Sequence, residues 1–209
     1  MRSQRKGQVQ REIQLKPQYQ KHLKGLSDGA LCVMVAEESE GKQGELAFTE
    51  LYQRYARRIH AYCFRILSNT EDAEDAFQET FLRFHKTVKA GGVMTNVSGL
   101  IFTIARNLCI NLKKKNTRWA SDDIEDHTLS SYDNTYDQKE LLSLIKTSLE
   151  LINPDYREAF VLREYNGFSY EEIARMLDVS VPTAKIRVFR AKEKIRKVLE
   201  PYLKDLLSI

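Results

Sequence analysis

The segment FSYEEIARMLDVSVPTAKIRVFRAKEKIRK, residues 168–197, decides the fold of the C-terminal part of the chain. Ser169 and Glu172 have the spacing of a capping box, which predicts the start of a short helix. A tight turn follows, after which Ser180 is suited to cap a long helix that tolerates Pro182 in its first turn. A short helix, a tight turn and a long basic helix together form a helix-turn-helix.

Helical periodicity divides the long helix into a buried and an exposed side. The apolar stripe that must pack on the preceding helices consists of Ala184, Val188, Ala191, Ile195, Val198 and Leu199. The residues turned outward include Lys185, Ile186, Phe189, Arg190 and Lys197. An exposed Phe beside an Arg is costly unless it meets a partner such as a thymine methyl group, so this face favours DNA binding over an ordinary basic surface.

Further helices are expected before and between these elements. Their predicted ranges are 27–38, 46–67, 69 to at least 84, 98–115, 141–151 and 156–165, with irregular loops at 41–44 and 89–98. The apolar stripe expected in the helix from residue 69 is Ala73, Ala76, Phe77, Phe81 and Phe84. The stripe expected over 98–115 is Leu100, Ile101, Ile104, Leu108 and Leu112.

Two of these helices carry charged faces. Asp72, Asp75 and Glu79 share one face, which could take a basic partner or a divalent cation, or be merely solvated. The exposed side of the helix over 98–115 carries Arg and Asn, the residue types that read base edges, and a run of Lys residues suited to phosphates. These outward residues are Arg106, Asn107, Asn111, Lys113, Lys114 and Lys115. His60 and Cys63 have the spacing of half a zinc site, but no second pair completes it.

Composition predicts a helical protein of a reducing compartment. The 209 residues carry a net charge of +4 and include only 9 Gly and 4 Pro, without Val/Ile/Thr-rich alternation, so sheet is not expected. The longest apolar run, residues 30–36, is far shorter than the roughly 20 residues of a membrane span, and no signal peptide precedes it. Cys32, Cys63 and Cys109 are odd in number and widely spaced, which argues against disulfides and favours the cytoplasm.

The charge distribution predicts the domain organisation. Residues 1–26 are polar and basic, which predicts a disordered tail that is either solubilising or a nucleic-acid-binding arm. Residues 119–138 carry six acidic and no basic residues with little periodicity, which predicts a flexible linker. The expected fold class is therefore all-α, with a small helical domain over 27–118 and a second, helix-turn-helix domain over 139–209 joined by this acidic flexible linker.

Five stretches, in this order, resemble those of bacterial sigma factors of the extracytoplasmic-function (ECF) group, the smallest members of the sigma-70 family. They are AFTELYQRY (47–55), DAEDAFQETFLRF (72–84), IARNLCINLKKK (104–115), FVLREYNGFSYEEIARML (160–177) and VSVPTAKIRVFRAKEKIRK (179–197). The resemblance covers about residues 27–205. It implies a factor that binds core RNA polymerase and directs promoter-specific transcription initiation, with no catalytic residue, cofactor or metal.

The resemblance also implies a role for each face. Four residues would dock on the clamp helices of the polymerase: Asp72, Asp75, Gln78 and Glu79. The loop over 89–98 would hold a base flipped from the melted minus-ten element, which the next helix would face through Arg106, Asn107, Asn111 and Lys113 to Lys115. The last helix would read the minus-thirty-five element in the major groove of double-stranded DNA through Thr183, Lys185, Ile186, Phe189 and Arg190. An anti-sigma factor is a further expected partner, and membrane insertion is not expected.

Three features depart from the family pattern. Leu100 stands where many relatives carry Trp, Ile186 replaces a common small polar residue, and the N-terminal tail is longer than usual. Two other classes of function would need features of their own. A stand-alone repressor would need a dimer surface or receiver domain, and a metal nuclease using Asp72, Asp75 and Glu79 would need a nucleophile, base or phosphate loop. The sequence presents none of these.

Overall fold

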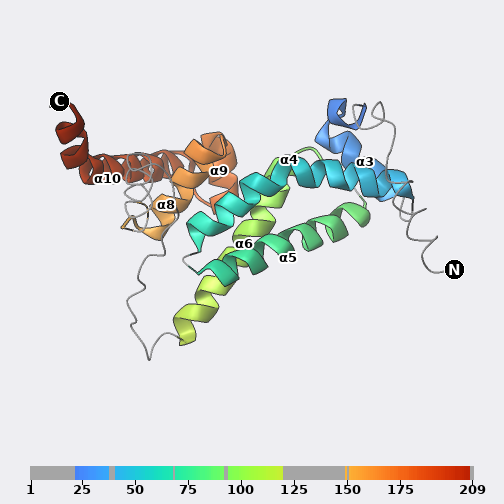
Figure 1. Cartoon of the computed structure of the whole chain (residues 1–209), viewed down its shortest axis with the longest axis horizontal. Coiled ribbons are helices and arrows are strands. Elements are labelled where there is room, and N and C mark those ends of the chain that lie inside the picture. Colours follow the sequence, from blue (N-terminus) through green and yellow to red (C-terminus); the bar gives the residue numbers. More distant parts are fainter. Residues whose placement is uncertain are drawn as a thin grey trace, which may run out of the picture. The chain divides into compact units, whose positions relative to one another are not determined.

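The computed structural model describes residues 22–37, 41–67, 69–91, 94–119, 149 and 151–207, and every regular element in these ranges is a helix (Figure 1). This confirms the predicted all-α fold class. The helices are α3 (Asp28–Glu37), α4 (Lys42–Ile66), α5 (Thr70–Lys89), α6 (Val97–Trp119), α8 (Pro154–Phe160), the π-helix η1 (Val161–Tyr165), α9 (Tyr170–Leu177) and α10 (Val181–Leu207). The N-terminal tail up to residue 21, the predicted linker beyond Trp119 and most of the predicted 141–151 helix lie outside the described residues.

The described residues pack into two compact units that share the long helices between them. The first takes in the residues up to Arg57 together with Gln78–Ile104, and the second takes in Arg58–Phe77 together with the residues from Ala105 onward. This division follows packing within the chain. The domain boundaries expected from the sequence, 27–118 and 139–209, follow composition instead and stay a prediction.

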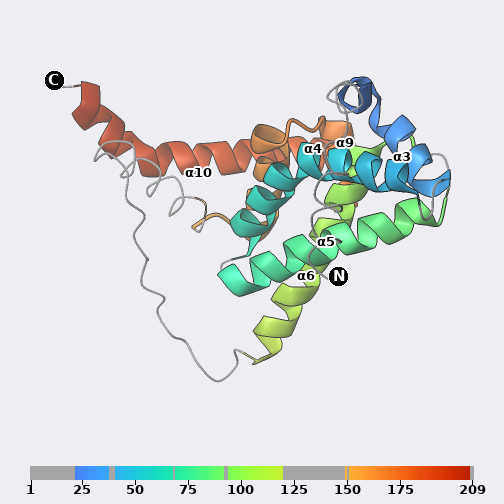
Figure 2. The same cartoon turned by 45° about the vertical axis from the view of Figure 1, so that its right-hand side comes forward.

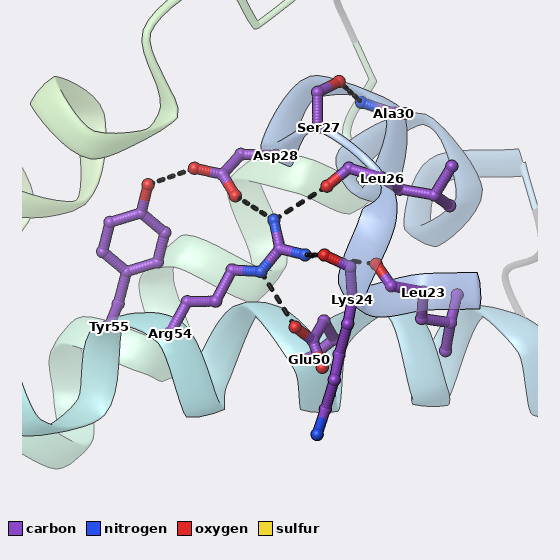
Figure 3. Close-up of polar contacts among 9 residues, drawn as sticks. All are labelled: Leu23, Lys24, Leu26, Ser27, Asp28, Ala30, Glu50, Arg54 and Tyr55. Atoms are coloured by element: carbon purple, nitrogen blue, oxygen red, sulfur yellow. Dashed lines mark hydrogen bonds and ion pairs between the residues drawn. The ribbon is translucent and has the colours of Figure 1, made fainter. Parts of the chain in front are cut away.

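In the first unit, Arg54 of α4 fastens the segment that precedes α3. Its guanidinium pairs with Asp28 at 2.7 Å and with Glu50 at 2.9 Å, and Tyr55 donates a hydrogen bond to the second Asp28 oxygen (Figure 3). The Arg54 guanidinium also donates to three backbone carbonyls, those of Leu26 at 2.9 Å, Lys24 at 3.0 Å and Leu23 at 3.1 Å. Burial lowers the pKa of Arg54, but hydrogen bonds and charge from Asp28 and Glu50 outweigh it and raise that pKa overall.

This anchoring corrects the expectation that the whole tail to residue 26 is disordered. Residues 22–25 are helical, and the side chain of Leu23 is only 3% exposed. The carbonyls at the end of a helix need partners, and here a side chain about thirty residues further along the chain supplies them. Local composition could not reveal that partner.

The rest of the first unit follows the predicted helices with one shift. The expected loop over 41–44 was wrong, because α4 begins at Lys42 and includes Gly44. The helices bury an apolar core that includes Leu31, Val35, Ala47, Leu51, Phe81, Phe84, Val88, Ile101 and Phe102. Asn69 and Asn96 cap α5 and α6, because their side chains accept hydrogen bonds from the amides of Asp72 and Gly99.

In the second unit, the helix-turn-helix forms where the sequence predicts it. Ser169 and Glu172 make both hydrogen bonds of the capping box, and Asp178 turns the chain in the left-handed region at φ 53°. Ser180 then accepts from the amide of Thr183 at 3.2 Å and starts α10. Figures 1 and 2 show α8 and α9 lying against the N-terminal half of α10. Three α10 residues of the predicted stripe are fully buried there: Ala184, Val188 and Ala191.

The helix predicted over 156–165 changes type along its length. It starts at Pro154, two residues earlier than predicted, behind the cap of Asn153, and continues from Val161 as a π-helix. The side-chain amide of Asn166 donates to the carbonyl of Val161 at 3.0 Å, and Gly167 then takes φ +72°, a value that favours glycine. The wider π turn was not predicted.

The buried side of α6 is turned from the one predicted. Ile101 and Leu108 are buried as expected, but Leu100, Ile104 and Leu112 are partly exposed. Phe102, Ala105 and Cys109 are fully buried instead. Small residues at 105 and 109 permit close approach of α6 to α4. There the hydrogen bond between Cys63 and Cys109, together with burial, raises the pKa of the Cys109 thiol far above its ordinary value.

Candidate nucleic-acid interface and acidic docking face

The outer face of α10 combines two large apolar side chains with two cations. Ile186 and Phe189 are 55% and 61% exposed, and Lys185 and Arg190 are exposed beside them. The Lys185 ammonium lies 5.7 Å from the centre of the Tyr170 ring, a cation–π contact that holds the Lys185 side chain near the start of α10. A helix with this face can read base edges in a major groove, because it offers a guanidinium fork and apolar contacts together.

Other cations of α10 are used to hold the helix in place. Arg187 pairs with Asp155 of α8 at 2.7 Å, and Lys192 pairs with Glu164 of η1 at 2.8 Å. The Lys192 ammonium is therefore engaged with a carboxylate within the same unit. Thr183 likewise bonds to Ser180 through its hydroxyl at 2.8 Å. These contacts fix which α10 residues remain directed away from α8 and α9.

The residues expected on the outer face of α6 divide into two groups. Those that are exposed as predicted are Asn107, Asn111, Lys114 and Lys115. Arg106 and Lys113 are only partly exposed: the Arg106 side chain is 20% exposed, and burial lowers the pKa of Lys113. Both follow from the turned buried side of α6.

Arg106 lies in a buried polar cluster that the sequence did not predict. Its Nε is 2.9 Å from Oε1 of Glu158 in α8, and the hydroxyl of Tyr62 in α4 donates to the same oxygen at 2.9 Å. Tyr62 is fully buried and Glu158 is 9% exposed. Burial, then the charge of Glu158, raise the pKa of Tyr62 well above its ordinary value, so Tyr62 stays a donor. Glu158 lies in a segment that is otherwise rich in buried residues. A carboxylate in such a segment was the signal that could have predicted a buried polar contact.

The acidic face of α5 is present as expected. Asp75 and Gln78 are exposed, while Asp72 and Glu79 are partly exposed. Arg83 pairs with Glu79 at 2.7 Å, with side chains 52% and 41% exposed, which reduces the local charge without covering it. Leu82 is 58% exposed on the same face and was missed, although its spacing of seven from Asp75 predicts it. The face is therefore acidic with one apolar residue.

The predicted loop over 89–98 is shorter than expected. Lys89 ends α5 and Val97 begins α6, and Gly91 takes φ +82° directly after α5. Gly92 and Val93 lie outside the described residues. The part that is described therefore supports an irregular connection without showing what it holds.

Neither candidate metal site gathers a set of ligands. Within the described ranges, no group of three or more His, Cys, Asp or Glu side chains is arranged to hold an ion. His60 instead stacks on Phe64 with ring centres 4.4 Å apart and lies 3.4 Å from Glu74. Within the same ranges, no helix is both long and apolar enough to cross a membrane.

Comparison with known proteins matches both halves of this arrangement. Sigma-70 region 2 matches residues 51–119, and Sigma-70, region 4 matches residues 142–195. The ECF RNA polymerase sigma factor SigW of Bacillus subtilis is 31% identical over 166 residues, covering 73% of this chain and 89% of SigW. The ECF RNA polymerase sigma factor SigE of Mycolicibacterium smegmatis is 28% identical and covers 78% of this chain, which spans 65% of SigE. The sigma factor RpoE of Bartonella quintana, solved with the anti-sigma factor NepR, superimposes with a TM-score of 0.64 at 25% identity, covering 73% of this chain and 96% of RpoE.

The helix-turn-helix and the two matched regions define a transcription initiation factor of the sigma-70 class. The chain belongs to the ECF RNA polymerase sigma factors. As a member of that family it binds core RNA polymerase and directs promoter-specific initiation of transcription.

Proposed function

We propose that the chain recognises its promoters through two separate helices, with α10 reading the minus-thirty-five element and α6 the minus-ten element. The observation that carries the α10 assignment is the exposed row of Lys185, Ile186, Phe189 and Arg190, beside cations that are tied to α8 and η1. Thr183, at the start of the same helix, completes the proposed reading surface. The proposed domains are residues 27–118 and 139–209, with 119–138 as the linker.

On α6, the exposed Asn107, Asn111, Lys114 and Lys115 support the proposed minus-ten surface. Asn side chains can read a base edge, and Lys side chains can hold phosphates without sequence preference. Arg106 and Lys113 belong to the proposal as well; both are partly exposed, and Arg106 reaches DNA once its contact with Glu158 is released. The loop over 89–98 would hold a flipped base of the melted element.

The acidic face of α5 is the proposed docking site for core polymerase. Asp72, Asp75, Gln78 and Glu79 offer acceptors, and the exposed Leu82 adds an apolar contact at the C-terminal end of the patch. An acidic patch bordered by an apolar residue fits a basic partner surface, because charges steer the encounter and apolar burial contributes affinity.

Three further assignments rest on the family. The chain acts as an initiation factor and not as a catalyst, and it works in the cytoplasm, where transcription takes place. An anti-sigma factor is a proposed partner, which the likeness to RpoE in its complex with NepR supports. Each domain alone offers few cations to DNA, so binding without polymerase is expected to be weak and to weaken steeply with salt.

The test is to incubate the chain with core polymerase and a library of promoter fragments. Defined transcripts that share an upstream and a downstream element, and that require both the chain and core polymerase, support the proposal. Tight and specific DNA binding by the isolated chain at physiological salt would favour a repressor, and cleavage of the DNA would favour a nuclease. Either of those results would overturn it.

A further inference from the structure

The polar cluster around Glu158 joins residues that belong to different sequence regions of the chain. Tyr62 and Arg106 lie in α4 and α6, within the region 2 match, whereas Glu158 lies in α8, within the region 4 match. All three belong to the same compact unit. The contacts at 2.9 Å therefore connect the helix proposed to face the minus-ten element with the domain proposed to read the other element.

We infer that α8 and η1 form an intramolecular latch, in which Glu158 occupies the guanidinium of Arg106 and so withholds it from DNA. The inference rests on the proposed placement of Arg106 at the minus-ten surface. The Arg106 side chain is held against Glu158 through Nε and is only 20% exposed, so in this position its guanidinium has little access to a DNA phosphate. Engagement of Arg106 by DNA requires α8 to move away.

Two more arginines of α4 hold the other end of the latch. Arg58 donates to the backbone carbonyl of Asn166 at 2.7 Å, and its guanidinium is 5.9 Å from the Phe168 ring centre. The Arg65 guanidinium lies 3.9 Å from the centre of the Tyr165 ring. A Tyr ring that is 42% exposed is thereby covered on one face by a cation. The latch thus holds three arginines, and each is a cation that nucleic acid would otherwise attract.

The burial of the cluster makes the latch close or open as a whole. Glu158 is 9% exposed, so a departing Arg106 would leave a buried carboxylate that keeps the hydrogen bond from Tyr62 and the charge of Lys113 but loses its ion pair at 2.9 Å. A buried charge without its counter-ion is unfavourable, so release of Arg106 and withdrawal of α8 are coupled. The chain therefore has a closed state of low DNA affinity and an open state in which Arg106 is available.

The test measures the binding of the full chain to a fluorescein-labelled, single-stranded DNA of mixed sequence. Glu158→Gln keeps an acceptor for Tyr62 but removes the charge that holds Arg106, so we expect about tenfold tighter binding, the size of one charge-assisted contact. The slope of log affinity against log salt should steepen by about 0.7, the value for one more phosphate contact on a single strand. Tyr62→Phe removes only the hydroxyl that positions Glu158 and should give a smaller gain of about threefold.

Glu171→Gln is the matched control, because Glu171 is an exposed residue of α9 and its loss changes the net charge equally. Its affinity should stay within about twofold of the wild type. Adding Arg106→Ala to Glu158→Gln should abolish the gain. Circular dichroism checks folding, and Tyr62→Phe serves if Glu158→Gln unfolds.

Equal affinities of Glu158→Gln and Glu171→Gln, or a gain that survives Arg106→Ala, would overturn the latch. The proposed function would still stand if the wild type gave promoter-specific transcripts with core polymerase. Absence of transcripts would refute the proposed function whatever the oligonucleotide result. The two failures are therefore distinguishable.

Discussion

Replacing Arg190 by alanine is the sharpest test of promoter reading by α10. Arg190 is exposed and, in the part of the chain that the structure describes, forms no ion pair, so the substitution removes what this side chain contributes to DNA and little else. A bidentate contact between arginine and guanine contributes about 1 to 3 kcal/mol of discrimination, which corresponds to a preference of about 5-fold to 150-fold at one base pair. We expect that preference to disappear at one position of the upstream element.

Lys192→Ala provides the matched control on the same helix. The Lys192 ammonium lies 2.8 Å from Glu164, with side chains 50% and 36% exposed, and such a pair contributes about 0.2 to 1 kcal/mol to stability. Its loss should slightly lower stability and change the use of all promoters about equally. The position preferences of Lys192→Ala should therefore match the wild type.

The assay is transcription by core polymerase from a promoter library, with the sequences of productive promoters counted for each variant. Asn107→Ala provides a second comparison, because it lies on α6 and should change preference only in the downstream element. Identical preferences for the wild type and Arg190→Ala would refute base reading through Arg190. A shift in the upstream element for Asn107→Ala would show that the helices are assigned to the wrong elements.

Three other predictions concern stability, polymerase binding and the linker. Arg54→Ala should lower the free energy of unfolding in urea by about 3 kcal/mol, because several charge-assisted hydrogen bonds are lost. Arg83→Ala removes one exposed ion pair and should lower it by less than about 0.5 kcal/mol. Equal losses in the two variants would contradict the anchoring role of Arg54. Asp75→Lys with Glu79→Lys should weaken core binding in a pull-down by several kcal/mol while Glu45→Lys does not, and unchanged binding would leave α5 a solvated face. The last prediction concerns four acidic linker residues, Asp122, Asp123, Glu125 and Asp126. Neutralising all four should reduce the yield of full-length transcripts more than core binding, since an acidic segment can follow a basic channel. Wild-type transcript yields would make the linker a plain spacer.

The features that the sequence predicted correctly are those set by neighbouring residues. The capping box at Ser169, the cap at Ser180 and the turn after Leu177 each depend on side chains within about four residues, so their geometry follows from local spacing. The exposed Ile186 and Phe189 follow in the same way, because one strong apolar stripe fixes the outward side of α10. Local consistency of this kind made the helix-turn-helix predictable.

The features that were missed depend on partners far away in the chain. Leu23 is buried because Arg54 holds the segment around it, and no pattern within residues 1–26 indicates that arginine. Arg106 is turned inward because Phe102 and Cys109 form the buried side of α6, where Cys109 meets Cys63 of α4. Helical periodicity gives the width of a stripe but leaves its centre uncertain when apolar residues flank it on both sides.

The short segment formed by α8 and η1 contacts both α10 and α6 through three acidic residues, each of which pairs with a cation. Asp155 and Glu164 each pair with a cation of α10, while Glu158 pairs with Arg106 of α6. The first two pairs are partly exposed and leave the outward row of α10 in place, whereas the third is buried and removes a cation from the α6 surface. Since carboxylates and DNA phosphates compete for cations, the α10 surface is ready for DNA in the closed state, whereas the α6 surface lacks Arg106. In the latch that we infer, upstream recognition can therefore precede downstream recognition, and opening of the Glu158 cluster is the step that separates them.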